Sequence, residues 1–185
     1  MIVIGTAMAR ILPLAVGIGD IASWVAAAAT LGLLIAAVLA GKTALDTLRA
    51  QRLAAQRQRV YDLLARTFDE DFIRMGILAE TFFDNPPKTP TGWARRWKAT
   101  SSDEGAVIQA VMNFYEVVAG EYNTDGVLDR QLADKALMVI TYAWWKRAEP
   151  FANWVRDNRN PQAFEEWRAA SDAYEKAYPE KAPVA

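Results

Sequence analysis

The sequence of 185 residues contains neither cysteine nor histidine. The lack of cysteine excludes a disulfide framework, a thiolate metal site and a cysteine nucleophile. The lack of histidine removes the commonest zinc ligand and the usual general base. Basic and acidic residues number 21 and 22, so a net charge of −1 gives no overall attraction to nucleic acid. Glycine-rich phosphate-binding motifs are also absent. We therefore expect no cofactor, no metal and no nucleic-acid partner.

One stretch near the N-terminus carries no charge at all. Residues 21–41 contain no Asp, Glu, Lys or Arg and are rich in Leu, Ile, Val and Ala. A helix over this run is about 30 Å long, which matches the hydrocarbon thickness of a bilayer. The sequence therefore predicts a transmembrane helix over residues 20–41, with Trp24 near one membrane interface.

A cleaved signal peptide is the alternative interpretation of this region. Arg10 would form its basic segment, and Val38-Leu39-Ala40 resembles a cleavage site. However, the apolar run exceeds the roughly 7–15 residues of a signal-peptide core, and Asp20 interrupts a core that begins at Ile11. Both features favour a permanent anchor. Within the apolar N-terminal segment 1–19, either Pro13 begins a longer, tilted helix or residues 11–19 lie along the interface.

Basic residues dominate the chain just after the predicted span. They are Lys42, Arg49, Arg52, Arg57, Arg59 and Arg66. Because positive residues stay on the cytoplasmic side, we expect the N-terminus to lie outside and the C-terminal domain to lie in the cytoplasm. Lys42, Arg49 and Arg52 are placed to contact anionic lipid headgroups, at about 1 kcal/mol each. The alternative is an ordinary positive flank that binds no specific lipid.

Small residues recur at every fourth position of the predicted span. They are Ala28, Gly32, Ala36 and Ala40. This spacing places them on one helix face, where a second transmembrane helix can approach closely. The alternative is chance, because alanine is abundant throughout the segment.

The rest of the chain shows helical patterns and no strand-length alternation. No glycine or proline interrupts residues 42–67, which indicates a basic helical arm that continues the span. Apolar residues in 68–178 recur at three- and four-residue steps, as in amphipathic helices. The sequence predicts an all-α protein. It has one N-terminal transmembrane helix, the arm, a small cytoplasmic helical bundle over 68–178 and a frayed tail over 179–185.

Capping residues indicate where the helices of the bundle begin and end. Asp69-Glu70-Asp71 and Ser101-Ser102-Asp103-Glu104 are typical helix starts. Asn160 is the predicted N-cap of the last helix, with Pro161 at its first helical position. Pro150 either begins a new helix or kinks the preceding one.

Aromatic side chains are the most prominent candidates for contact with a partner. Trp93 and Trp97 are interleaved with basic residues, a pattern that suits a membrane surface or nucleic acid, or a short helix with its rings inward. If exposed, Trp93, Trp97, Trp145 and Trp154 would anchor a protein partner. Otherwise they fill a helical core.

Glu116 is the most interesting ionisable residue. It lies in a largely apolar helix with Asn113 three residues earlier, on the same face. Burial would raise the pKa of its carboxyl and suit it to proton transfer. The alternative is a buried polar contact, in which Glu116 binds Asn113 or a basic residue of a neighbouring helix, namely Arg130, Lys146 or Arg147.

A succession of short motifs in the second half of the chain resembles a known family. The motifs are Val111–Val118, Gly126–Asp129, Tyr142–Trp145, Glu149–Phe151, Asn160-Pro161 and Phe164-Glu165. Their order is similar to an uncharacterised bacterial family, the domain of unknown function 4760. The similarity covers residues 20–175 in layout and 105–168 in motif, and this chain departs from the pattern in its Ala-rich start and Trp144-Trp145. It implies a single span, a basic arm and a helical domain, but no activity.

These observations and the family resemblance favour a non-enzymatic, single-pass protein of the bacterial inner membrane. Its cytoplasmic domain would bind another protein or form a homo-oligomer. The alternative is an accessory subunit of a larger membrane complex, packed through its transmembrane helix. A carboxylate-dependent enzyme is a third interpretation, and it requires a deep pocket that gathers Glu116 with Tyr115 or Tyr142.

Overall fold

The computed structural model describes the backbone of residues 3–179 and the side chains of residues 23, 25, 26 and 28–179. The predicted interface residue Trp24, the side chains of segment 1–19 and the tail beyond residue 179 lie outside the described part. The chain divides into two compact units, Met1–Arg52 and Leu53–Ala185.

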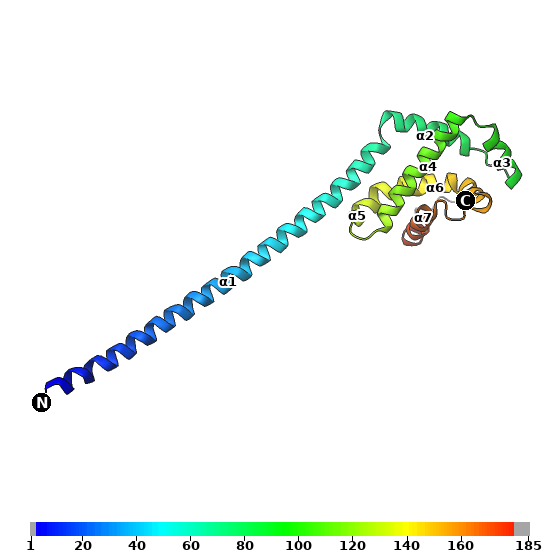
Figure 1. Cartoon of the computed structure of the whole chain (residues 1–185). Coiled ribbons are helices and arrows are strands. Elements are labelled where there is room, and N and C mark those ends of the chain that lie inside the picture. Colours follow the sequence, from blue (N-terminus) through cyan, green and yellow to red (C-terminus); the bar gives the residue numbers. More distant parts are fainter. Residues whose placement is uncertain (1–2, 180–185) are drawn as a thin grey trace. The chain divides into compact units, whose positions relative to one another are not determined.

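The first unit is helical throughout its described backbone. Helix α1 (Val3–Thr67) begins here and continues without a break into the second unit (Figure 1). Every side chain from residue 28 to residue 55 is exposed, including large aliphatic ones such as Leu33 and Val38. Among the described residues, α1 holds one stretch that is long and apolar enough to cross a membrane. The predicted continuous helix over residues 20–67 is confirmed.

The second unit consists of short helices, with no strand among residues 53–179. They are α2 (Glu70–Phe83), α3 (Pro90–Ala99), α4 (Ser102–Asn123), α5 (Arg130–Leu132), the π-helical turn η1 (Ala133–Leu137), α6 (Met138–Asn158) and α7 (Glu165–Ala177). The predicted all-α class is confirmed.

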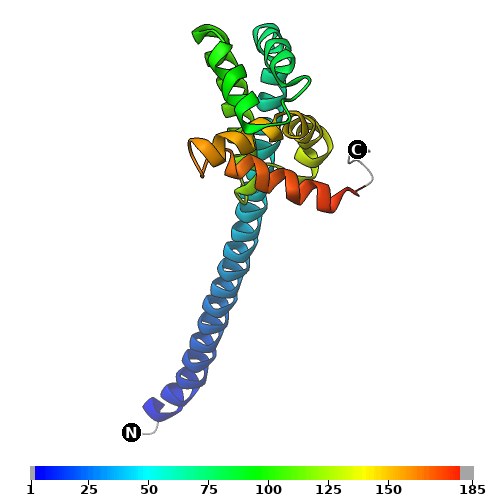
Figure 2. The same cartoon turned by 90° about the vertical axis from the view of Figure 1, so that its right-hand side faces the viewer.

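Helix α4 is the centre of this bundle. It packs against α2 on one side and α7 on another, and α6 contacts both α4 and α7 (Figure 2). Tyr115 of α4 stacks on Trp144 of α6 and Trp167 of α7, with ring centroids 5.5 and 5.3 Å apart. Offset aromatic stacking adds about 1 kcal/mol per pair beyond area burial. Large rings therefore fill most of this small core.

The last turns of α1 belong to the bundle. Val60 and Leu63 are buried in its core. Arg57 donates to the Asp129 carboxylate at 2.8 Å, and Arg59 forms an ion pair with Glu121. The sequence placed these two arginines in the basic flank after the span, and in the structure they bind carboxylates of the domain.

Most predicted helix ends agree with the structure. Asp69 caps α2, and Ser101 with Glu104 forms a capping box at the start of α4. Helix α6 runs through Pro150 to Asn158 because the buried side chains on both sides of the proline, including Trp145 and Phe151, hold the helix together.

The predicted start of the last helix was wrong. Residues 161–164 form a turn instead, and α7 begins at Glu165. The Asn160 side chain accepts a hydrogen bond from Gln162 N at 3.1 Å, and Ala163 N donates to Asn160 O at 3.0 Å. These two hydrogen bonds stabilise a tight turn. Phe164 then takes a left-handed conformation, with φ 58° and ψ 33°, immediately before α7.

Candidate functional site

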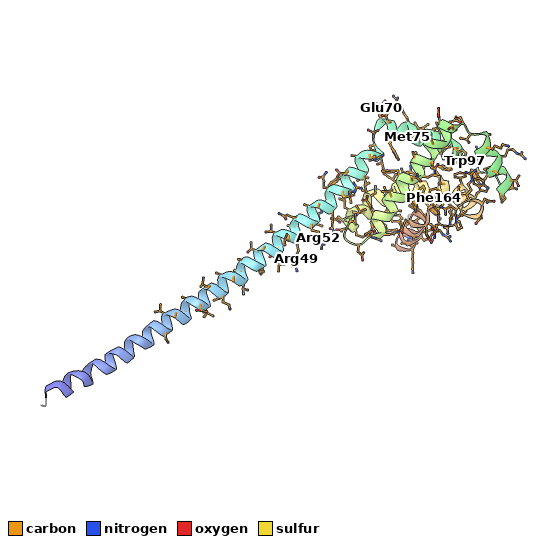
Figure 3. All side chains as sticks on the ribbon, viewed as in Figure 1. Arg49, Arg52, Glu70, Met75, Trp97 and Phe164 are labelled. Atoms are coloured by element: carbon orange, nitrogen blue, oxygen red, sulfur yellow. The ribbon has the colours of Figure 1, made fainter. Side chains whose placement is uncertain are left out.

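The residues predicted to act at the membrane are all exposed on α1. Ala28, Gly32, Ala36 and Ala40 are open to solvent, and nothing lies within 4 Å of a Cβ placed on Gly32. The arm's basic residues are also exposed: the side chains of Arg49 and Arg52 project from α1 (Figure 3), and so does that of Lys42. These side chains are available to lipid or to a second helix, and both roles stay predictions.

Three of the four tryptophans predicted as possible contact residues are not exposed. Trp93, Trp145 and Trp154 keep only 4, 1 and 7% of their surface, so their proposed role as exposed anchors was wrong. Trp97 is half-buried. The physical reason is the small size of the bundle, because one helical layer on each side of α4 needs bulky rings to fill it.

The basic residues of α3 are divided between structure and solvent. Arg96 donates to the carbonyl oxygens of Phe82, Asp84 and Asn85 at 2.8, 3.0 and 2.9 Å. It thereby provides donors for carbonyl groups at the end of α2 and in the two residues that follow it, where the helix itself offers no partner. Its neighbour Arg95 is exposed. The interpretation of this stretch as a short helix with Trp93 inward agrees with the structure.

Glu116 binds a helix terminus rather than any residue the sequence suggested. Its Oε1 accepts from Glu166 N at 3.2 Å, and its Oε2 accepts from Trp167 N at 2.9 Å. Phe164 occupies the N-cap position of α7 and has no side-chain acceptor, so a carboxylate from α4 supplies it. Negative charge at a helix N-terminus is also favourable. The role of Glu116 shown by the structure is helix capping across the core.

The environment of Glu116 shifts the pKa of its carboxyl upward. Burial is the largest cause, and the nearby charges of Glu166 and Glu165 add to it, whereas the two backbone hydrogen bonds oppose it. Asn113 is exposed, so its prediction as a buried polar residue was wrong. Asn113 lies about one helical turn before Glu116 on α4, and its side chain faces solvent at the edge of the bundle.

The pocket that the enzymatic interpretation requires is not gathered around Glu116. The cavity beside Glu116 is lined by neither Tyr115 nor Tyr142. Both tyrosines are buried in the core, and burial raises the pKa of each phenol. Among residues 28–179, no group of three acidic side chains is placed to hold a metal ion.

The most exposed apolar surface of the bundle lies at the start of α2. Phe68, Ile73 and Ile77 keep 68, 45 and 60% of their surface. With the half-buried Ile140 and Trp144 of α6, they surround a depression of about 200 Å³. We call these five residues the α2 patch.

A glycine of α2 lies beside the indole in this depression. Gly76 is buried in α2, and a Cβ at this position would meet Cζ2 of Trp144 at 3.4 Å, an ordinary van der Waals contact. Gly76 and Trp144 both line the depression. An ion pair between Glu70 and Arg74 lies on α2, and Glu80 of α2 forms a second ion pair with Arg147 of α6. An apolar centre beside charged residues is the usual composition of a protein contact surface.

Sequence reasoning did not single out the α2 patch, although a signal was present. Apolar residues occupy nearly every face of α2, which is more than a helix with one buried stripe requires. Phe68 directly follows Thr67, where α1 ends and the chain turns. The turn leaves the Phe68 ring outside.

The geometry defines an all-α protein with an exposed apolar helix followed by a small aromatic-rich helical bundle. A family model described as "Domain of unknown function (DUF4760)" matches residues 21–170. The chain belongs to this family, as the motifs between residues 105 and 168 predicted. Neither the curated proteins nor the solved structures yielded a match.

Proposed function

We propose that this protein is a non-enzymatic, single-pass protein of the bacterial inner membrane that binds a partner protein through the α2 patch. Its N-terminus lies outside and its helical domain lies in the cytoplasm. The uncharged run 21–41 and the basic residues after it support this placement. The observation that carries the binding role is the exposure of Phe68, Ile73 and Ile77 around an open depression.

The expected occupant of the α2 patch is a bulky apolar side chain of another protein. Exposing three large apolar residues together costs hydration free energy that a partner would recover, at about 25 cal/mol per Å² buried. The depression of about 200 Å³ has room for one aliphatic or aromatic side chain against Trp144. Interface energy concentrates at such anchor-in-pocket contacts. The competing occupant is a second copy of this chain.

The test is the mass of the particle extracted gently from its native membrane, with identification of every chain in it. We expect a stoichiometric assembly with a second polypeptide. The variant Ile77→Glu should release that polypeptide, because it places a charge in the apolar centre. Val117→Glu is the matched control. Val117, like Ile77, is a β-branched aliphatic residue with an exposed side chain, at 54%, but it lies outside the α2 patch.

Each other outcome contradicts a stated part of this proposal. Recovery of the wild type as a monomer with no other chain would contradict the proposed stable partner. A particle containing only two copies of this chain would replace the partner by self-association. A complex that survives Ile77→Glu would move the contact elsewhere, and the exposed face of Ala28, Gly32, Ala36 and Ala40 is then the next surface to test. That result would favour the accessory-subunit interpretation.

A further inference from the structure

A second hollow of the bundle lies on a different face from the α2 patch and shares none of its residues. This cavity of about 430 Å³ is bounded by α3, α4, the end of α6 and the turn before α7. Its volume falls within the range of small-molecule sites, which is roughly 300–1,000 Å³. Its apolar wall includes Trp97, Met112, Phe151 and Phe164. Trp97 and Phe164, both half-buried, are labelled in Figure 3.

A guanidinium without a carboxylate partner stands at this cavity. Arg159 lines the cavity and is exposed. Its Cζ lies over the rings of Trp97 and Trp154, 5.6 and 5.2 Å from their centroids. Its side chain forms no ion pair with any residue in the described part of the chain. Contact with two indole rings holds the planar Arg159 guanidinium in place, while its N–H donors stay free.

The other charged group at the cavity already has hydrogen-bond partners within the fold. Both carboxylate oxygens of Glu116 accept backbone N–H groups at the start of α7. The helix N-terminus therefore offsets part of its negative charge. The remaining polar side chains of the wall are amides, including Asn113 and Gln162. Arg159 is thus the charged group of this cavity with free hydrogen-bonding capacity.

The backbone on the cavity wall is strained. Phe164 has φ 58° and ψ 33°, a left-handed conformation that bulky residues rarely adopt and that costs on the order of 1 kcal/mol or more. This conformation leads the chain from the Asn160 turn into α7, and Phe164 lines the same cavity as Trp97. Such strain persists only where the surroundings hold it, and here Glu116 does so from α4.

We propose that this cavity binds a small organic anion whose apolar or aromatic body lies against Trp97, Met112 and Phe164 and whose carboxylate pairs with Arg159. The carboxylate accepts two parallel N–H donors of the guanidinium, as Arg–carboxylate pairs commonly do. The apolar body replaces water on the cavity wall. This site is independent of the α2 patch and of the proposed partner.

The test compares one acid with its uncharged analogue on the full-length protein in lipid nanodiscs. The probes are 3-phenylpropionate and 3-phenylpropanamide, followed by equilibrium dialysis and ligand-observed NMR. We expect the acid to bind about tenfold more tightly or better than the amide, the difference expected of a charge-assisted pair. Arg159→Gln should abolish that preference. Arg95→Gln, an exposed arginine of α3 outside the cavity, should retain it.

A second variant fills the cavity without touching the guanidinium. Asn113→Trp places a large ring on an exposed position of the wall, so the bundle should keep its far-ultraviolet circular dichroism while both probes lose binding. The proposal is overturned if the wild type binds neither probe at millimolar concentration, or binds both equally. It is also overturned if Arg159→Gln keeps the preference for the acid, or if Asn113→Trp leaves binding unchanged.

Discussion

At the residue scale, Glu116 shows how one side chain connects distant elements. Helix α7 begins after Phe164, a residue with no acceptor for the free N–H groups of the first turn. A carboxylate fifty residues earlier in the chain provides that acceptor, on α4. The contact joins two helices that also share the stacked rings of Tyr115 and Trp167. Glu116 therefore fixes where α7 starts.

Truncation of this cap is expected to destabilise the bundle. Glu116→Ala leaves the N–H of the buried Trp167 without an acceptor, and loss of an N-cap costs about 1 kcal/mol. The measurement is urea unfolding of the full-length protein in detergent, followed by tryptophan fluorescence. Val117→Ala, at the next and exposed position of α4, is the control and should change the midpoint little. Equal midpoints for both variants would contradict the capping role.

The raised pKa of Glu116 predicts a pH dependence of definite sign. Because the folded-state pKa of Glu116 lies above its ordinary value of 4.5, the native state binds the proton more tightly than the unfolded state. Its contribution to stability is complete below pH 4.5 and is lost as pH rises through the folded-state pKa. The variant Glu116→Gln has no titratable group at this position, so it lacks this pH-dependent contribution.

The unfolding free energy of the wild type relative to Glu116→Gln should therefore fall as pH rises through that window. Urea midpoints of the two proteins at a series of pH values measure it. A difference that stays constant, or that grows with pH, would contradict the upward shift of the Glu116 pKa.

At the element scale, the connection between α2 and α3 depends on Arg96. The segment after α2 contains Asp84, the left-handed Asn85 and two prolines, so it cannot close with regular backbone hydrogen bonds. The guanidinium of Arg96 donates instead to the carbonyl oxygens of Asp84 and Asn85 in this segment and to that of Phe82 in the last turn of α2. Its position over the Trp93 ring, 5.5 Å from the centroid, keeps it against the core.

Loss of this guanidinium should loosen α3. We expect Arg96→Ala to destabilise the bundle by about 1–3 kcal/mol, the range for hydrogen bonds to a charged group. Arg96→Lys should recover only part of this loss, because an ammonium cannot present the planar fork. Thermal unfolding by circular dichroism measures both. Arg95→Ala, next to it and exposed, should be close to neutral. A loss in Arg95→Ala equal to that in Arg96→Ala would contradict the specific role of Arg96.

At the scale of the whole molecule, the uncharged helix and the basic residues after it predict both anchoring and orientation. The chain lacks cysteine, so single cysteines can report on topology without background. We expect a membrane-impermeant maleimide to label Thr6→Cys in intact spheroplasts and to label Lys88→Cys, in an exposed loop, only after permeabilisation. The reverse labelling pattern would show the opposite orientation. Recovery of the chain in the soluble fraction would contradict the predicted transmembrane span.

Local patterns in the sequence were sufficient for the helices and for several of their ends. The capping residues Asp69 and Ser101 act within one turn of the chain, so their effect can be read without knowing the fold. The prediction of Asn160 as a helix N-cap was wrong because its side chain can accept a hydrogen bond in a turn as readily as at a helix start. Pro150 left two alternatives open, because packing around it decides between them.

The candidate sites were much less accessible to the sequence. Ile77 and Trp145 are both large apolar residues in helices, and only their packing distinguishes the exposed one from the buried one. The partner of Glu116 lies fifty positions away on the main chain of α7, where no residue type signals it. Arg159 gains its position from two rings that belong to α3 and α6.

The sequence by itself determined the properties that depend on near neighbours in the chain. These are the uncharged helix, the all-α class, the family and the absence of cysteine and histidine chemistry. Only the tertiary structure decided which apolar residues remain exposed as the α2 patch, what Glu116 caps and where a cavity opens beside Arg159. The physical reason is that helix formation and hydropathy follow local spacing, whereas burial and cavity shape depend on contacts between segments far apart in the chain.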